Sequence, residues 1–179
     1  NIKAFEKNSA WTLDYDSKIL GENPMGYIIL HDILREKIEE ELLNNKFIKV
    51  ISKFDATSYR NNILYSKSLD PIKCSVLIGA DGRNSWTRTQ TSIRARTMEY
   101  GQKALIMHVL HENNHHNTAY EMFTKNGPLA FLPMQSHGEK FQSGIVWCDD
   151  IKNNWMKEDS NEILQEKLHE LFPYLGNLS

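Results

Sequence analysis

Hydrophobic and polar residues follow a pattern along the first half of the chain that predicts several strands and one helix. The helix begins at Asp32, a suitable N-cap, and ends at Asn44-Asn45, because hydrophobic residues recur on one face between them. A strand-like segment follows this helix, as in an α–β step of a parallel sheet. The strands expected here are the alternating segment of Trp11, Leu13 and Tyr15, then Gly26–Leu30, Phe47–Ile51, Ala56–Arg60, Ile63–Lys67 and Cys74–Ala80.

Two turns in this half have informative residues. Asn61-Asn62 separates two strand-like segments, and asparagine tolerates the left-handed backbone conformation, so the pair predicts a hairpin. The last strand runs directly into Gly79-Ala80-Asp81-Gly82, and Ser85 is then a good N-cap for a new helix. This order places the second turn at the carboxyl end of a strand, where open α/β sheets bind their ligands.

The side chains of this second turn suit contacts with a ligand that carries sugar or phosphate groups. Gly82 permits a positive φ and lets the backbone approach a ligand closely. Asp81 can accept hydrogen bonds from sugar hydroxyls, and Arg83 and Arg88 can face phosphate. The alternative is an ordinary Asp-Gly turn that closes a strand, with Ser85 acting only as a helix cap.

From Gln102 onward the pattern changes to strands joined by short connections, which predicts a mostly antiparallel sheet. A last helix starts with a capping-box-like pair, Asp159 and Glu162, and stops at Pro173. We therefore predict a mixed α/β fold, with a partial dinucleotide-binding unit over residues 1–97 and the antiparallel sheet with its helix over residues 98–179. The strands expected in the second part are Lys103–Glu112, Thr118–Thr124, Leu129–Leu132 and Ser143–Cys148.

Composition and charge exclude several other classes of function. Of the 179 residues, 40% are hydrophobic and 25% are charged, which is ordinary for a globular protein. A net charge of −2 and the lack of a basic tract argue against nucleic-acid binding. No hydrophobic run is long enough to span a bilayer, so any membrane contact would be peripheral. Cys74 and Cys148 lie in apolar segments and are expected to be reduced core residues of a cytosolic protein.

Two other kinds of site have little support. His111, His115 and His116, with Glu112 among them, suggest a metal cluster, but their spacing is not that of zinc ligands. We interpret His111 as a strand position and the other two histidines as part of a solvated loop, so no metal site is predicted. Ser85 lacks the Gly-x-Ser-x-Gly surroundings that expose a nucleophile, and no catalytic protein residue is predicted.

Five short blocks stand in a fixed order along the chain. They are Leu77–Arg88, Tyr100–Ala104, Ala119–Phe123, Gly127–Pro133 and Gly144–Cys148. The first resembles the "DG" motif of the class A flavin monooxygenases. Together they resemble the branch of that class that hydroxylates polyprenylated phenols in ubiquinone biosynthesis. The resemblance is strongest from about Lys73 to Cys148 and weaker from Gly26 to Leu43.

The resemblance implies an FAD/NAD(P)-binding Rossmann-like unit joined to a substrate domain, with NAD(P)H as the reductant. In this class FAD performs the oxidation, while the protein binds the phenol and excludes water, so no protein nucleophile is needed. By the same resemblance, Gly127–Pro133 is a strand at the back of the substrate cavity. Its cavity-facing residues are either Leu129 and Phe131 or Ala130 and Leu132, and Phe123, Ile145 and Trp147 are further candidates. The cofactor-binding residues carried over are Asp81, Gly82, Arg83, Ser85 and Arg88.

Two motifs of the family are missing from this sequence: the Gly-x-Gly-x-x-Gly segment that holds the FAD pyrophosphate and a later Gly-Asp motif. We therefore expect an internal fragment of a longer enzyme, which binds FAD weakly or not at all and is inactive alone. Apolar surface left bare in such a fragment should promote self-association. The DNA on either side of this reading frame should encode the two missing motifs.

Two alternatives stay open. One is a hydroxylase of the same class with a smaller phenolic substrate, and the other is a non-catalytic module that binds lipid-like phenols or scaffolds partners. The expected partners are a polyprenylated phenol and other quinone-biosynthesis proteins, without nucleic acid. The expected location is the cytoplasm, at the periphery of the inner membrane if the protein contacts a membrane.

Overall fold

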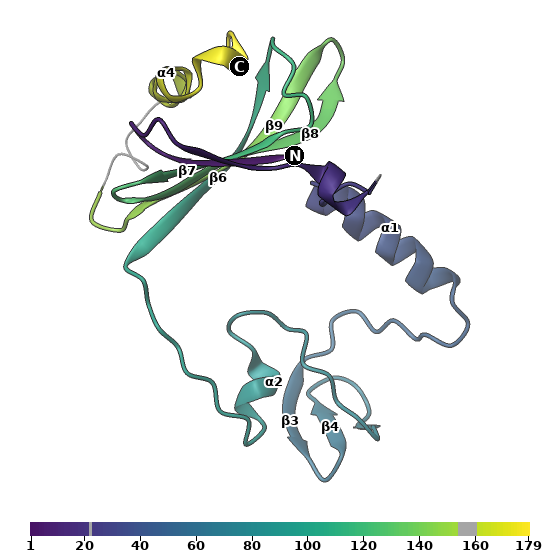
Figure 1. Ribbon diagram of the computed structural model, residues 1–179. Helices are drawn as coiled ribbons and strands as arrows, with labels where there is room; N and C mark the ends of the chain where they lie inside the picture. The colour runs from purple at the N-terminus through teal and green to yellow at the C-terminus, as the bar shows by residue number, and fades with distance from the viewer. Residues whose placement is uncertain (22, 154–160) are drawn as a thin grey trace. The chain divides into compact units, whose positions relative to one another are not determined.

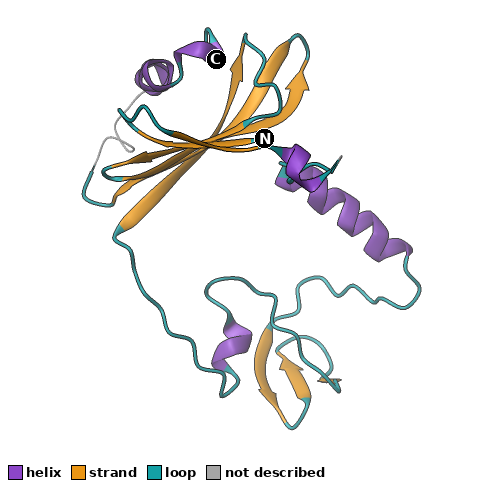
Figure 2. Ribbon diagram, in the orientation of Figure 1, coloured by secondary structure: helices purple, strands orange, loops and turns teal. Residues whose placement is uncertain are grey.

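The chain has a mixed α/β fold, as the sequence predicts (Figures 1 and 2). The computed structural model describes residues 1–21, 23–153 and 161–179. They divide into two compact units, one formed by Asn1–His31 with Glu99–Ser179 and the other by Asp32–Met98. The first unit contains a six-stranded mixed sheet and the second a three-stranded antiparallel sheet.

The six-stranded sheet has the strand order β2-β1-β7-β8-β9-β6. All its neighbours are antiparallel except β1 and β7, whose parallel pairing sets Ile2 opposite Ala119. All four strands predicted in the second half form, and β8 and β9 extend beyond their predicted ends. The strands are β1 (Ile2–Glu6), β2 (Thr12–Tyr15), β6 (Gln102–His111), β7 (Ala119–Thr124), β8 (Gly127–His137) and β9 (Lys140–Asp150).

A helix covers one face of this sheet and completes the hydrophobic core. Helix α4 (Asn161–Leu171) and the short 3-10 helix η2 (Pro173–Leu175) lie over that face (Figure 1). The helix ends before Pro173, as predicted, whereas Asp159 lies outside the described residues. Side chains alternate between the two faces of a strand, so only every second strand residue enters the core. The core residues are Val109, Met122, Leu129, Phe131, Ile145, Leu168, Phe172 and Leu175.

The second unit contains the predicted hairpin and the two helices predicted for the first half of the chain. The first of these begins at His31, so Asp32 lies in its first turn, and the prediction of Asp32 as its N-cap is wrong. Asn61 and Asn62 have φ values of 53° and 61°, which a two-residue hairpin turn with positive φ at both positions requires. The helices keep little hydrophobic surface buried, and Ile38 of α1 is 49% exposed. The elements of this part of the chain are α1 (His31–Asn44), β3 (Ala56–Arg60), β4 (Ile63–Ser66), β5 (Ile72–Lys73) and α2 (Trp86–Thr89). The short 3-10 helix η1 (Ser17–Leu20) belongs to the first unit.

Three segments that the sequence predicts as strands are irregular in the structure. Gly26–Leu30, Phe47–Ile51 and Cys74–Ala80 pair with no strand in the part of the chain that is described. A buried strand needs neighbouring strands, and an apolar run does not reveal whether they are present. The side chains of Val76 and Ile78 are accordingly 73% and 82% exposed. The prediction of strands at these three segments is wrong for the described residues, and the Asp81 turn therefore does not stand at the carboxyl end of a strand.

The predicted boundary near residue 97 lies beside the change between the two units at residues 98 and 99. The first 31 residues nevertheless group with the later part of the chain, because β1 and β2 complete its sheet. The assignment of one part to the cofactor and the other to the substrate stays a prediction.

Two side-chain environments differ from those predicted. Cys74 and Cys148 are free thiols, as expected, but both are partly exposed and neither is a core residue. His115, predicted to lie in a solvated loop, is only 5% exposed. Its Nε2 lies 3.0 Å from the carbonyl oxygen of Met134, and its Nδ1 accepts the backbone N–H of Asn117 at 3.1 Å. These contacts bury the ring because the loop folds back on β8.

His111 lies beside this ring and is fully buried. Its Nδ1 is 2.8 Å from the carbonyl oxygen of Asn113, which can only accept, so Nδ1 carries the proton. Its Nε2 is 2.9 Å from the hydroxyl of Ser143 and can accept its hydrogen. The neutral imidazole therefore satisfies both neighbours.

We expect acidification to destabilise the protein through His111. Burial, followed by the neighbouring His115, lowers the pKa of His111 below its ordinary value of 6.5. The unfolded chain therefore takes up this proton first, and the free energy of unfolding falls as the pH drops through about 6.5 toward the folded pKa. Urea unfolding at about pH 7.5 and pH 5.5 should show this loss in the wild type and in His108→Gln, an exposed control, and a smaller loss in His111→Gln. An equal loss in all three would rule out His111 as the cause.

Candidate functional site

The carboxylate of Asp81 organises the turn that leads into α2. One of its oxygens accepts the hydroxyl of Ser85 at 2.5 Å, and the other accepts the backbone N–H of Thr87 at 2.9 Å. The Ser85 oxygen also accepts the N–H of Arg88 at 3.0 Å, which makes Ser85 the N-cap that the sequence predicts. The hydrogen bond from Ser85, and then that from Thr87, lowers the pKa of Asp81 to about 2. The carboxylate is therefore ionised at neutral pH and holds the start of the helix.

The other residues of this turn divide into those that build it and those that face solvent. Arg88 donates from Nη2 to the carbonyl oxygen of Arg83 at 2.9 Å and so braces the turn. Gly82 has a φ of 81°, and a Cβ at this position would meet no atom within 4 Å. Gly82 and Arg83 are both exposed. The structure thus brings the five predicted cofactor residues together, but it uses Asp81, Ser85 and Arg88 inside the turn. Their contact with a cofactor stays a prediction.

A pocket of about 550 Å³ adjoins the Asp81 turn within the second unit. Its volume lies in the usual range for sites that bind small molecules. The hairpin supplies one wall and the start of α2 supplies another. The lining residues are Phe54, Asp55, Ala56, Leu64, Lys67, Leu77, Asp81, Trp86 and Thr87.

Replacing Asp81 by alanine should release the first turn of α2. The backbone N–H of Thr87 loses its acceptor, and the hydroxyl of Ser85 loses the partner that orients it. Amide hydrogen exchange at Thr87 and Arg88 should become faster, as measured by NMR, with Asp70→Ala as a control in a loop of the same unit. Unchanged exchange at both amides would show that Asp81 does not hold the helix.

The structure places four of the five predicted substrate-lining residues on the face of the sheet that α4 covers. Leu129, Phe131 and Ile145 have no exposed surface and pack in the core. Trp147 lies on the same face, opposite Leu129, and is partly exposed at the edge of the core. A ligand could reach the three buried residues only if the helix moved away. Their contact with a substrate stays a prediction without support from this placement.

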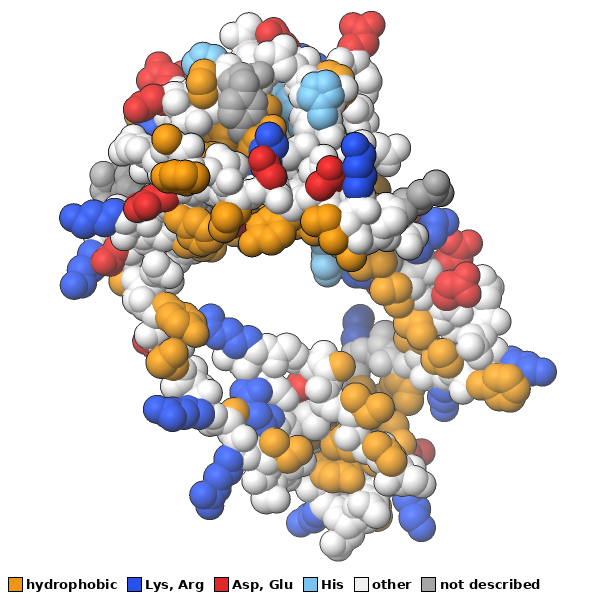
Figure 3. Space-filling view, in the orientation of Figure 1, with side chains coloured by type: hydrophobic (Ala, Val, Ile, Leu, Met, Phe, Trp, Pro, Cys, Tyr) orange, Lys and Arg blue, Asp and Glu red, His pale blue; other side chains and the backbone are white. Residues whose placement is uncertain are grey.

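Phe123 lies on the opposite face, and we call that surface the open face. It carries the side chains that alternate with those of the core, including Ala130 and Leu132, the second pair that the sequence allowed. Phe123 is 52% exposed and Ile106 is 71% exposed. Figure 3 shows hydrophobic side chains gathered along this side of the sheet. An apolar surface of this kind typically marks a binding surface.

One charged residue stands in the middle of the open face, and the sequence analysis did not single it out. Glu121 lies between Ala4 of β1 and Ala130 of β8 in the strand register. Its side chain is partly buried, and this burial raises its pKa above the ordinary value. The sequence did contain a signal for this residue, because Glu121 is the one acidic residue in the segment Thr118–Thr124, which is predicted as a strand.

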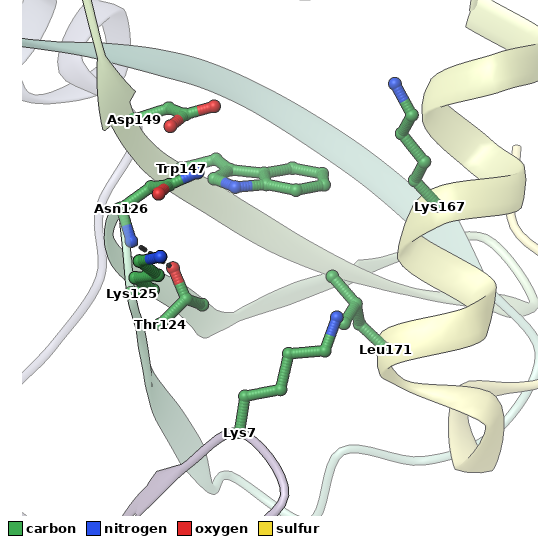
Figure 4. A pocket seen from close by; sticks show the side chains of 8 residues that line it. All are labelled: Lys7, Thr124, Lys125, Asn126, Trp147, Asp149, Lys167 and Leu171. Atoms are coloured by element: carbon green, nitrogen blue, oxygen red, sulfur yellow. Dashed lines mark hydrogen bonds between the residues drawn. The ribbon is translucent and has the colours of Figure 1, made fainter. Parts of the chain in front are cut away.

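A second pocket, of about 400 Å³, lies in the first unit, between the β7–β8 turn and α4 (Figure 4). The indole of Trp147 forms one wall. The side chains of Lys7, Lys125 and Lys167 contribute positive charge, and Asp149 contributes a carboxylate. The turn itself is held by the hydroxyl of Thr124, which donates to the carbonyl oxygen of Gly127 at 2.7 Å. We assign no anion-binding site to this pocket, because lysine side chains on a surface do not by themselves define one.

The described residues contain no group of three histidine, cysteine, aspartate or glutamate side chains placed to hold a metal ion. None of the described helices has both the length and the hydrophobicity needed to cross a bilayer.

Comparison with known proteins identifies relatives over most of the chain. The model of a family described as "FAD binding domain" matches residues 31–174. The ubiquinone hydroxylase UbiL of Rhodospirillum rubrum is 30% identical over 83% of this chain and 34% of its own length. The 3-demethoxyubiquinol 3-hydroxylase of Escherichia coli is 25% identical over 83% of this chain and 38% of its own. The mitochondrial ubiquinone biosynthesis monooxygenase COQ6 of Caenorhabditis elegans is 30% identical over 70% of this chain and 29% of its own length. The chain thus spans about a third of the length of these curated relatives.

Proposed function

The chain belongs to the FAD binding domain family, and we propose that it forms part of an FAD- and NAD(P)H-dependent monooxygenase that hydroxylates a polyprenylated phenol. The match over residues 31–174 carries the proposal, because it includes the Asp81 turn and four of the six strands of the open face, β6, β7, β8 and β9. Relatives that share 25–30% identity are named as a ubiquinone hydroxylase, a 3-demethoxyubiquinol 3-hydroxylase and a ubiquinone biosynthesis monooxygenase, which supports this substrate class.

The residues of the Asp81 turn fit one edge of a bound FAD. The open space around Gly82 admits a close approach to its backbone, and the exposed Arg83 can face a phosphate. No Gly-x-Gly segment for the pyrophosphate occurs in the sequence. When bound, FAD supplies the oxygen-transfer chemistry, with NAD(P)H as the reductant. The chain's own contribution is to contact the cofactor at the turn and to offer an apolar surface to the phenol.

Flavin reconstitution tests this proposal. The purified chain is mixed with FAD and desalted, and its flavin absorbance is recorded. We expect well under one FAD per chain, because the Asp81 turn alone makes few contacts. Extending the chain to the length of its relatives should give stoichiometric flavin and NAD(P)H oxidation that depends on an added polyprenylated phenol. Stoichiometric flavin on the present chain would overturn the claim of an incomplete cofactor site. An extended chain without flavin would overturn the proposed function.

The open face favours one second candidate, a non-catalytic module that binds lipid-like phenols. Its uncovered apolar side chains could receive such a molecule without any flavin. The same surface should also promote self-association of this chain, which light scattering during size-exclusion chromatography measures. A polyprenylated phenol that binds the extended chain but never stimulates NAD(P)H oxidation would favour the module.

A further inference from the structure

The position of Glu121 on the open face indicates a specific role. The strand register sets six residues in one line across the sheet, each from a different strand. Glu121 is the only polar member of this line and stands between the two smallest side chains. From β6 to β2 the line reads Ile106, Val146, Ala130, Glu121, Ala4 and Leu13.

The carboxylate of Glu121 has no polar neighbour to satisfy it. In the part of the chain that the structure describes, no hydrogen bond or ion pair reaches it, and burial is the sole cause of its raised pKa. The other titratable side chains of this face include Glu6, Tyr15, His108, Cys148 and Asp150, and all of these stand on other lines of the register. A partly desolvated carboxylate without a partner costs stability, so it typically occurs where a ligand supplies the partner.

We propose that Glu121 accepts the hydrogen bond of a phenol hydroxyl whose ring and hydrophobic chain lie on the open face. The proposal rests on the hydroxylase function proposed above and assigns a residue to substrate recognition. Ala4 and Ala130 leave space on both sides of the carboxylate, in which a flat ring can approach the sheet. Phe123, two residues along β7 on the same face, offers a further apolar contact for that ring.

The chemistry of the surroundings favours a phenol over a cation. A phenol brings one hydroxyl donor and an otherwise apolar surface, which matches one acceptor amid alanine, valine, leucine and isoleucine side chains. An ammonium group brings a full charge and three donors, and the line of residues around Glu121 contains no second acceptor for them. The hydrogen bond would also draw the hydroxyl proton toward Glu121. That increases the electron density of the ring carbons ortho and para to the oxygen, which is the requirement for electrophilic hydroxylation.

Binding of simple phenols to the chain tests the role of Glu121. The probes are 4-hexylphenol and its methyl ether 4-hexylanisole, which lacks the donor, and dissociation constants come from isothermal titration calorimetry at neutral pH. The wild type should bind the phenol about tenfold more tightly than the ether, because a hydrogen bond to a charged acceptor is stronger than one between neutral groups. Glu121→Ala should abolish this preference, and Glu121→Gln should leave a smaller one. Asp14→Asn, on the other face of the same sheet and paired with Lys3, should keep the wild-type ratio.

Two further measurements separate recognition from a structural role. The melting temperature of Glu121→Gln should equal or exceed that of the wild type, since the variant removes an unpartnered carboxylate. The preference for the phenol should decline as the pH falls through the raised pKa of Glu121, because a protonated carboxyl is a weaker acceptor.

Each contrary result has a distinct meaning. Equal binding of phenol and ether by the wild type, a preference that survives in Glu121→Ala, or tighter binding of hexylammonium than of 4-hexylphenol would each overturn the proposal. None of these results would affect flavin reconstitution of the extended chain, which tests the proposed function separately.

Discussion

Replacing Phe131 by alanine is expected to lower the free energy of unfolding by about 3–5 kcal/mol. The ring has no exposed surface and lies 5.3 Å from the ring of Phe172, centroid to centroid, where α4 and η2 meet the sheet. Its removal leaves a cavity in the contact that holds the helix on the strands. Urea unfolding followed by circular dichroism measures the loss, provided the helical and sheet signals unfold together.

Phe123→Ala is the matched control for this prediction. It removes the same side chain from the adjacent antiparallel strand, but from the open face, where the ring is 52% exposed. We expect a loss of about 1 kcal/mol or less. The pair of variants thus reports which face of the sheet is the core. Similar losses in both variants would mean that something covers the open face in solution, and light scattering would show whether a second copy of the chain does so.

Gly127→Ala is expected to lower the free energy of unfolding by about 3 kcal/mol or more. Gly127 has a φ of 152°, a backbone conformation that residues with a side chain rarely adopt. A Cβ there would lie 2.9 Å from the backbone carbonyl oxygen of Cys148, which is fixed in the sheet and cannot withdraw. The added methyl group must therefore separate β8 from β9 or distort the turn.

Gly138→Ala provides the comparison for Gly127. Gly138 also has a positive φ, of 62°, but a Cβ at this position meets no atom within 4 Å. Gly138→Ala therefore costs only the strain of placing a residue with a Cβ at positive φ, which lowers the free energy of unfolding by about 1 kcal/mol. The difference between the two variants, measured from urea unfolding, isolates the clash with Cys148. If Gly127→Ala costs no more than Gly138→Ala, the close contact with β9 does not exist in solution.

The sequence predicts well those features that neighbouring residues determine. The hairpin at Asn61-Asn62 forms because two adjacent asparagines accept positive φ. The helix after Ser85 forms because a capping hydroxyl precedes it by one residue. The strands of the second half follow from alternation within each segment and from short connections.

The irregular segments show why the same reasoning fails elsewhere. Val76 and Ile78 belong to an apolar run that reads as a buried strand, yet a strand exists only where another strand supplies its hydrogen bonds. The pairing of β1 with β7 is a real contact that the sequence did not predict, since no local pattern indicates that Ile2 lies beside Ala119. Both outcomes depend on partners that are distant in sequence.

By itself, then, the sequence determined the mixed fold class, the N-cap at Ser85 after the Asp-Gly turn and the family resemblance, because these reside in short runs of residues. Only the tertiary structure decided which face of the sheet α4 covers. That decision buries Phe131 and exposes Phe123, although alternation along a strand treats both faces alike. It also isolates Glu121 among apolar side chains, because its neighbours come from other strands. The packing of separate strands and a helix creates these environments.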